Sequence, residues 1–343
     1  MSDVQQTLST RQALSVLFGV LVSVTVLGWA FYQVDLRGAL RTIQRFGFWW
    51  TLPMLCCYLS SFLVRGIRWQ LLLQPVARVS WRTSTGVLFS GYMANNLLPL
   101  RLGEIVRAVV LGQVTAARVE GTLSTIVLER VFDGLVLVGI IALVVVSGDA
   151  GSEQGVILYT GVASAVLFAG ALAFVIAARL FPRALLKGAR WMLRRLPIVE
   201  EEKGLDAIRS LLRGLLSLAL NRRLVAVLGL SGAVWLLEGG MFWVGLYAFD
   251  LSPTPLTAGL TLALVNLSIL LPSAPGYVGV FQGGTIIAFA AVGLSKEAAL
   301  SYSIVVHTLQ YVSVTIIGLA ALSAFGISLS SLRTASIASA PSE

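Results

Sequence analysis

The sequence predicts an all-α polytopic membrane protein with about six spans and two re-entrant helical hairpins in an inverted repeat. Of its 343 residues, 57% are hydrophobic and only 12% are charged, whereas a soluble domain carries about 25% charged residues. Apolar stretches recur at lengths near the roughly 20 residues that a helix needs to cross a bilayer. Proline and glycine break two of these regions, one in each half. Paired breaks of this kind are typical of transporters with inverted halves.

Six apolar stretches predict the spans. In chain order they cover residues 12–34, 46–64, 134–148 (extended backwards through 121–133), 154–178, 224–249 and 298–325. The first stretch is longer than the core of a signal peptide and has no convincing small-residue cleavage site. We therefore expect it to remain as the first helix.

The two broken regions predict hairpins that enter the bilayer and turn back inside it. The first covers residues 83–112 and breaks at Pro99 and Gly103. The second covers residues 256–293, and its break residues are Pro272, Pro275, Gly276 and Gly279. Unwound backbone is tolerated in hydrocarbon only where protein or a water-filled cavity satisfies its polar groups. The alternative for the second break is a tight loop at the outer surface.

The distribution of charge predicts the orientation. Residues 179–223 hold eleven Lys and Arg against four acidic residues, which places this loop in the cytoplasm. The connection at 148–153 has Asp149 and Glu153 but no cation, so we expect it outside. Both termini then lie in the cytoplasm, and the protein lies in the cell (inner) membrane.

This tracing gives one integral membrane domain, residues 1–343, made of two inverted halves. The halves cover about 11–148 and 154–326, and a short tail follows at 327–343. Residues 35–45 fit this topology less easily, because they carry three arginines at four-residue spacing but lie on the outer side of the membrane in this tracing. An amphipathic helix at the membrane surface would explain them.

Polar residues surround the first break. Ionisable groups inside a membrane cost about 2.5–3.5 kcal/mol each and are functional candidates by default. Arg101 offers a two-pronged donor suited to a lipid phosphate. Glu104 either balances Arg101 or meets a cationic headgroup, and Asn96 lies close by in sequence. The alternative is a simple Arg101–Glu104 pair that closes the hairpin.

A second polar cluster, Glu129, Arg130 and Asp133, lies in the third span. Glu129 and Asp133 are four residues apart and share a helical face, with Arg130 about 100° away. Three charges in one helical turn should avoid lipid, so we expect them to face the first hairpin. Alternatively, they lie at the cytoplasmic end and reach water.

The second hairpin offers mainly uncharged polar groups. Asn266 and Gln282 flank its break, where exposed backbone amides and carbonyls could hold a headgroup or an ion. Glu238, in the span 224–249, could supply the missing charge. Arg68 is a further candidate because it lies close in sequence to the first hairpin.

Other polar and aromatic residues have ordinary explanations. Arg65, Trp69 and Trp81 are interpreted as interfacial anchors. His307, the single histidine, is either a core residue or part of a proton relay.

Signatures of catalysis are missing from the sequence. We find no Gly-rich phosphate loop, no metal-spaced His/Cys set and no nucleophile elbow. The adjacent Cys56 and Cys57 suggest packing alone. We therefore expect no catalytic residue, no metal and no cofactor. The net charge of +9 is assigned to membrane orientation, so no nucleic-acid partner is expected.

Four motifs occur in a fixed order: Arg68-Trp69, Asn96-x-x-Pro99-x-Arg101-x-Gly103-Glu104-x-x-Arg107, Glu129-Arg130-x-x-Asp133 and Pro272-x-x-Pro275-Gly276-x-x-Gly279. With these motifs the chain resembles the lysylphosphatidylglycerol synthase transmembrane-region family. That family includes the flippase-like membrane domain of bacterial multiple peptide resistance factors and its stand-alone relatives. The resemblance covers nearly the whole chain.

The resemblance implies movement of aminoacylated phosphatidylglycerol between leaflets, with a separate cytosolic domain making that lipid. The resemblance does not extend to the synthase part, so we expect no lysyl transfer. Many family members carry an acid near Gln282, where this chain has a neutral amide. Other relatives accompany glycosyltransferases of isoprenoid-linked sugars.

We therefore expect a lipid flippase that moves a phospholipid or a lipid-linked headgroup. The alternatives are a membrane-embedded enzyme with Glu104 or Asp133 as general base, or an accessory subunit of a lipid-modifying synthase or glycosyltransferase. The expected partners are the membrane lipid substrate and a lipid-modifying enzyme, and a homo-oligomer is compatible with the sequence.

Overall fold

The computed structural model describes residues 10–32, 35–98, 102–146, 180–194, 222–251, 253–271 and 273–328, with isolated positions within 155–177 and 202–209. These residues form helices and contain no strand, as the sequence predicts. Pro99, Arg101 and Pro272 lie outside the described residues, as does most of the predicted span 154–178.

The helices, in chain order, are α1 (Thr10–Tyr32), α2 (Leu36–Gln44), η1 (Phe48–Trp50), α3 (Thr51–Leu73), α4 (Trp81–Leu97), α5 (Gly103–Thr115), α6 (Val119–Val146), α8 (Pro182–Leu193), α10 (Arg222–Ala248), α11 (Pro255–Ser268), η3 (Pro275–Tyr277), α12 (Val280–Ala291) and α13 (Lys296–Ala324). Local signals fix several of their starts. Ser80 and Thr254 accept bonds from backbone amides three residues later, and Pro255 occupies the first turn of α11. Such caps satisfy amides that have no partner inside the helix.

Among the described residues, three stretches are long and apolar enough to cross a bilayer: Phe48–Leu73, Arg222–Ala248 and Lys296–Ala324. The first differs from the sequence prediction, which ended this span at residue 64. The helix continues to Leu73 because Arg65 and Arg68 are buried inside the bundle. Their assignment to a membrane boundary is therefore wrong for Arg65, and also for the fully buried Trp69.

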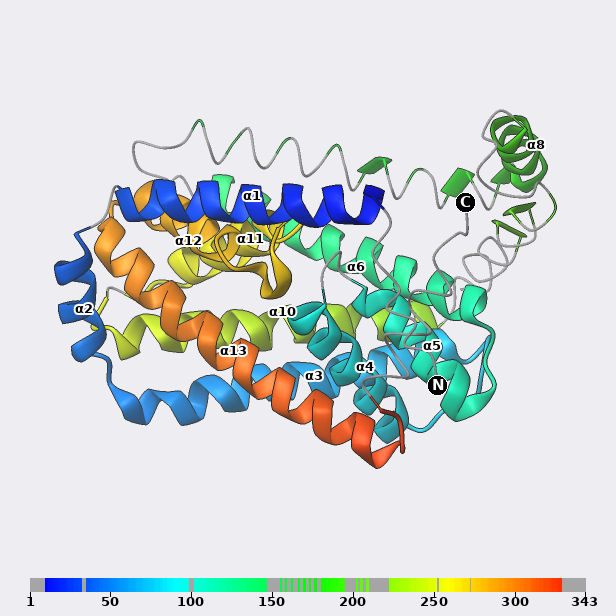
Figure 1. Cartoon of the computed structure of the whole chain (residues 1–343), viewed down its shortest axis with the longest axis horizontal. Coiled ribbons are helices and arrows are strands. Elements are labelled where there is room, and N and C mark those ends of the chain that lie inside the picture. The colour runs from blue at the N-terminus through cyan, green and yellow to red at the C-terminus, as the bar shows by residue number, and fades with distance from the viewer. Residues whose placement is uncertain are drawn as a thin grey trace.

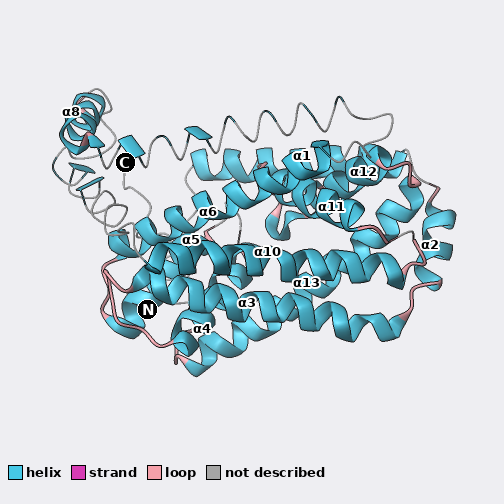
Figure 2. Ribbon diagram, turned by 180° about the vertical axis from the view of Figure 1, so that it is seen from behind, coloured by secondary structure: helices cyan, strands magenta, loops and turns pink. Residues whose placement is uncertain are grey.

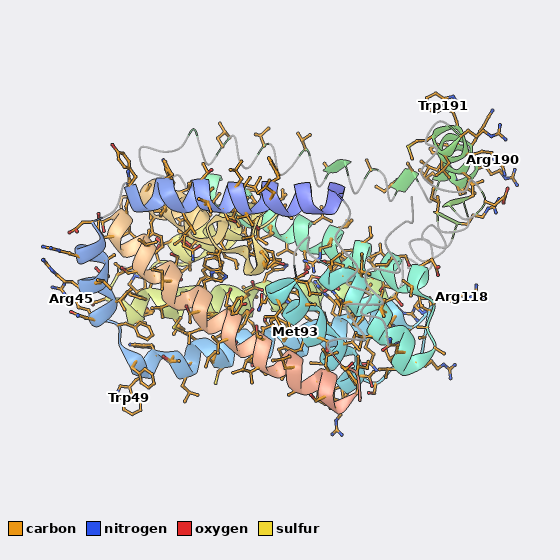
Figure 3. All side chains as sticks on the ribbon, in the orientation of Figure 1. Arg45, Trp49, Met93, Arg118, Arg190 and Trp191 are labelled. Atoms are coloured by element: carbon orange, nitrogen blue, oxygen red, sulfur yellow. The ribbon has the colours of Figure 1, made fainter. Side chains whose placement is uncertain are left out.

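Helices α3 and α10 run side by side along the long axis of the molecule, and α13 crosses the bundle obliquely (Figure 1). Helix α2 crosses one end of the bundle, and α8 lies beyond the other, as the reverse view also shows (Figure 2). Arg45 and Trp49 lie at the α2 end, and Arg190 and Trp191 belong to α8 (Figure 3). Tryptophan and arginine are typical of the two boundaries of a membrane.

Helix α2 has the amphipathic character predicted for residues 35–45. Asp35 caps its start by accepting from the backbone amide of Arg37. Arg37 and Arg41 are exposed, whereas Ala39 is buried in a small cluster with Leu300 of α13. This packing fixes the helix across the end of the bundle.

Helix α13 shows how the two predicted hairpins are directed. Gly86, near the start of α4, packs against Phe325 just past the end of α13, whereas Asn96 near the end of α4 bonds to Thr315. The first hairpin, α4–α5, therefore advances from the C-terminal end of α13 toward its middle. The second hairpin, α11–α12, runs directly into the N-terminal end of α13. The hairpins thus enter the bundle from opposite ends.

Candidate functional site

The turns of the two hairpins meet beside the middle of α13. Asn96 at the first turn donates from Nδ2 to Tyr311 O at 3.3 Å and to Thr315 Oγ1 at 3.0 Å. The Tyr311 hydroxyl donates to Asn96 O at 3.3 Å. Gly276 of the second turn is buried against the Tyr311 ring. The predicted convergence of the two breaks is thus present, and the second break is not a loop at the surface.

A side-chain bond closes the first turn. Asn95 Oδ1 accepts from the backbone amide of Gly103 at 2.7 Å. Gly103 also lies directly against Gly91 O, so any side chain at position 103 would collide with backbone. The glycine is required here by this close approach. The predicted phosphate ligand, Arg101, lies in the undescribed part of this turn.

The second turn relies on backbone geometry and neutral caps. Gly276 and Gly279 have φ of 72° and 92°, a region that favours glycine. Gln282 Oε1 accepts from the Gly279 amide at 2.8 Å, and Ser23 Oγ of α1 accepts from the Ala274 amide at 2.7 Å. Gln282 Nε2 lies 3.2 Å from His307 Nδ1. Gln282 therefore stabilises the backbone of the second turn by accepting from its amide.

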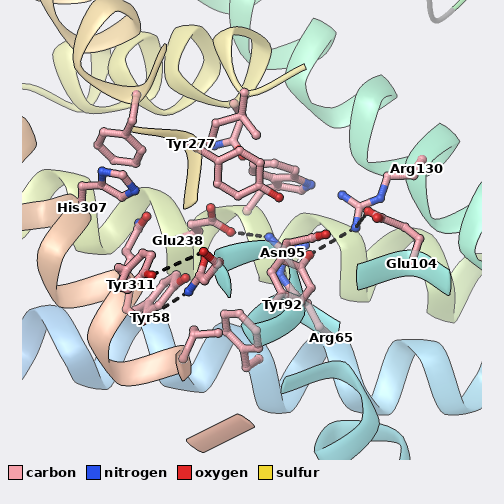
Figure 4. A pocket seen from close by; sticks show the side chains of 18 residues that line it. Tyr58, Arg65, Tyr92, Asn95, Glu104, Arg130, Glu238, Tyr277, His307 and Tyr311 are labelled. Atoms are coloured by element: carbon pink, nitrogen blue, oxygen red, sulfur yellow. Dashed lines mark hydrogen bonds and ion pairs between the residues drawn. The ribbon is translucent and has the colours of Figure 1, made fainter. Parts of the chain in front are cut away.

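A polar cavity of about 110 Å³ lies between the two turns, and we call it the central pocket (Figure 4). Both hairpins and helices α3, α6, α10 and α13 contribute to it. Its polar and charged lining residues are Tyr58, Arg65, Tyr92, Asn95, Asn96, Glu104, Arg130, Glu238, Asn266, Tyr277, His307, Gln310 and Tyr311. Five of the predicted site residues line this one cavity: Asn96, Glu104, Arg130, Glu238 and Asn266.

A cluster of buried ionised side chains lies beside the central pocket. Arg68 Nη2 donates to Glu129 Oε1 at 2.9 Å, and Arg68 Nη1 donates to Asp133 Oδ1 at 2.5 Å. Ser231 Oγ accepts a further bond from Arg68 at 2.9 Å. Arg107 of α5 donates to Glu129 Oε2 at 2.7 Å. The cluster therefore joins the first hairpin to α3, α6 and α10.

Arg65 links this cluster to the central pocket. Its guanidinium bonds to Glu238 and lies 3.6 Å from Asp133 Oδ2. We call the whole set the charge network, with members Arg65, Arg68, Arg107, Glu129, Asp133 and Glu238. Its three cations and three anions cancel. Removing one partner of such a buried pair typically costs about 3–5 kcal/mol.

Arg130 lies on a different side of α6 from Glu129 and Asp133, as their spacing in the sequence predicts. Glu129 and Asp133 are buried in the charge network, which rules out the alternative that they reach water. Arg130 points elsewhere. Its side chain is 45% exposed, its Nη2 lies 3.8 Å from Glu104 Oε1, and it approaches the Tyr92 hydroxyl at 3.4 Å. Arg130 and Glu104 therefore form a loose, accessible pair at the edge of the pocket.

All three arginines of the network keep a donor without an acceptor, because the Nε atoms of Arg65, Arg68 and Arg107 make no hydrogen bond. Arg107 is buried and leaves its Nη1 without a hydrogen bond as well. Its guanidinium lies over the Trp69 ring, 4.2 Å from the ring centre. A cation above an aromatic face is stabilised electrostatically, which offsets part of the missing hydrogen bonding.

Sequence reasoning missed Arg65 and the pocket tyrosines. One available signal was the spacing of Tyr58, Phe62, Arg65 and Trp69, which places them on one face of α3. His307 was correctly placed in the last span, and its ring stacks on Phe281 at 4.4 Å. Whether these residues act on a ligand stays a prediction.

Among the described residues, no group of three or more His, Cys, Asp or Glu side chains could hold a metal. The arrangement offers instead a polar cavity inside an apolar bundle, bordered by a fixed ionic cluster. Such a cavity can bind a polar group that would otherwise be excluded from the membrane interior.

Residues 16–318 match the family described as Lysylphosphatidylglycerol synthase TM region. A "UPF0104 membrane protein" of Methanothermobacter thermautotrophicus is 25% identical over 284 residues, which cover 77% of this chain and 82% of the relative. The "Glycosyltransferase AglD" of Haloferax volcanii is 27% identical over 293 residues, covering 76% of this chain but only 46% of the relative. No solved structure matches the chain.

Proposed function

Since the chain belongs to the lysylphosphatidylglycerol synthase transmembrane-region family, we propose that it moves a phospholipid or a lipid-linked headgroup between the leaflets of a membrane. One observation carries the proposal: two hairpins enter from opposite ends, and their turns line one polar pocket halfway along α13. A headgroup crossing the bilayer needs such a polar site near the midplane.

An apolar groove beside the central pocket could bind the hydrocarbon chains of the lipid. This groove, of about 570 Å³, lies between α6, α10 and α11, and Trp235 lines both the groove and the central pocket. Trp235 is itself fixed by donating to Asp133 Oδ1 at 3.1 Å. We assign the groove to an acyl or isoprenoid chain whose headgroup occupies the pocket.

The basic residues of α8 set the orientation within this proposal. Arg183, Lys187 and Arg190 belong to the loop rich in cations, so the α8 end faces the cytoplasm. The accessible pair of Arg130 and Glu104 is the first contact for a headgroup in this proposal, and Arg101 is the phosphate ligand that the sequence predicts. An arginine fork suits a lipid phosphate.

Leaflet exchange of labelled lipids in reconstituted vesicles tests the proposal. We expect the protein to accelerate exchange of a labelled anionic phospholipid over empty vesicles, and Arg101→Ala to suppress the acceleration. The matched control is Arg118→Ala, which removes an exposed arginine from the α5–α6 connection. Exchange no faster than in empty vesicles, with several headgroups tried, would overturn the proposal.

The partial match to a glycosyltransferase favours a second candidate function. Because the matched region covers 46% of that relative, this chain could act as the membrane partner of a separate glycosyltransferase. Stable co-purification with such an enzyme at high salt would support this role, whereas its absence together with autonomous lipid exchange would exclude it.

A further inference from the structure

The carboxylates that line the central pocket already face cations. Glu238 is bonded to Arg65, and Glu104 lies 3.8 Å from Arg130. An ammonium group entering the pocket would have to displace an arginine to obtain a negative partner. Without that partner, the cost of removing the ammonium from water is uncompensated.

The neutral lining has a different chemical preference. It contains tyrosine hydroxyls and side-chain amides, among them Tyr58, Asn95, Asn266 and Gln310. Hydroxyl and amide groups offer both donors and acceptors. They therefore match the hydroxyl groups of a ligand, which also donate and accept.

The size of the pocket suits a small headgroup. Its volume of about 110 Å³ is several times the roughly 10–15 Å³ that a single water needs, so it has room for a glycerol or a single sugar ring. Esterification with lysine nearly doubles the glycerol phosphate headgroup.

We infer that the central pocket selects a phosphorylated polyhydroxyl headgroup, either a glycerol or a single sugar ring, over headgroups that carry an amino group. This inference rests on the proposed lipid translocation and names its substrate class. The hydroxyl groups lie among the neutral residues, and the phosphate meets Arg130 at the exposed edge.

Lipid binding to the full chain in nanodiscs tests the selection without requiring transport. The probes are phosphatidylglycerol, a polyprenyl phosphoglucose, lysylphosphatidylglycerol and phosphatidylethanolamine. We expect at least one polyhydroxyl lipid to bind about tenfold or more tightly than both amino lipids. A preference for the first or the second probe assigns glycerol or sugar. Equal or tighter binding of the amino lipids, or no binding of either polyhydroxyl lipid, overturns the inference.

Two variants locate the selection in the pocket. Tyr58→Phe removes one hydroxyl and should weaken polyhydroxyl binding roughly three- to tenfold, whereas Tyr247→Phe, outside the pocket, should not. Asn266→Asp adds a carboxylate without an arginine partner and should shift the preference toward the amino lipids. An unchanged preference in both pocket variants would place the selection elsewhere and contradict the inference.

The two proposals fail separately. Selective binding without leaflet exchange contradicts translocation and leaves the headgroup assignment standing. Leaflet exchange that proceeds equally for amino and polyhydroxyl lipids, without selective binding, contradicts the headgroup assignment alone.

Discussion

The two hairpins occupy equivalent places in the bundle but are held by different forces. The first is fixed by ionic bonds, because Arg107 of α5 bonds to Glu129 and Glu104 faces Arg130. The second lies within residues 251–295, which contain no charged residue at all. Its turn depends on glycine conformations, amide caps and packing against α1 and α13. The first hairpin is therefore the more firmly held side of the pocket, and we expect the second hairpin to be easier to displace.

The largest expected effect on stability comes from breaking the ion pairs that hold the first hairpin in place. Glu129→Ala leaves Arg68 and Arg107 buried without their shared partner, so we expect a loss of about 3–5 kcal/mol in the free energy of unfolding. Chemical unfolding in detergent measures it. Glu120→Ala is the control, because Glu120 is exposed on the same helix. Similar losses in both variants would show that the charge network does not anchor the hairpin.

A smaller loss is expected from the turn of the second hairpin. Gly276→Ala forces a side chain into φ of 72° and against the Tyr311 ring, which should cost about 1–3 kcal/mol. Gly293 has φ of 75° but open space around it. Gly293→Ala therefore reports the backbone strain alone, and the difference between the variants measures the contact at the turn. Equal losses would mean that this contact contributes nothing.

The smallest effect concerns the cap of the same turn. Gln282→Leu removes the acceptor for the Gly279 amide and the contact with His307, so we expect a loss of about 1 kcal/mol in the free energy of unfolding. Gln282→Glu keeps the acceptor and should retain more stability than Gln282→Leu. The same unfolding measurement ranks the two, and the reverse order would show that the cap is not what Gln282 contributes.

The sequence predicted both hairpins because their breaks have local physical causes. Proline removes an amide donor and glycine permits unusual backbone conformations, so Pro99, Gly103 and Pro275 mark turns without knowledge of the rest of the fold. The same holds for α2, whose arginine spacing is itself a helical signal.

The pairing inside the charge network was not predictable in the same way. Arg65 bonds to Glu238, 173 positions away, and no local pattern links the two. An arginine that follows an apolar run is equally compatible with a membrane boundary, which is why Arg65 was misassigned. The polar residues on α6 were recognised because three charges within one helical turn are conspicuous by themselves.

The balance of the charge network has an electrical consequence. A membrane voltage contributes about 2.3 kcal/mol for each elementary charge moved across 100 mV. Three arginines and three carboxylates bonded together sum to zero, so the field does no net work on them when they shift as one body. The cluster therefore adds no voltage dependence of its own to a rearrangement of this protein that carries it intact.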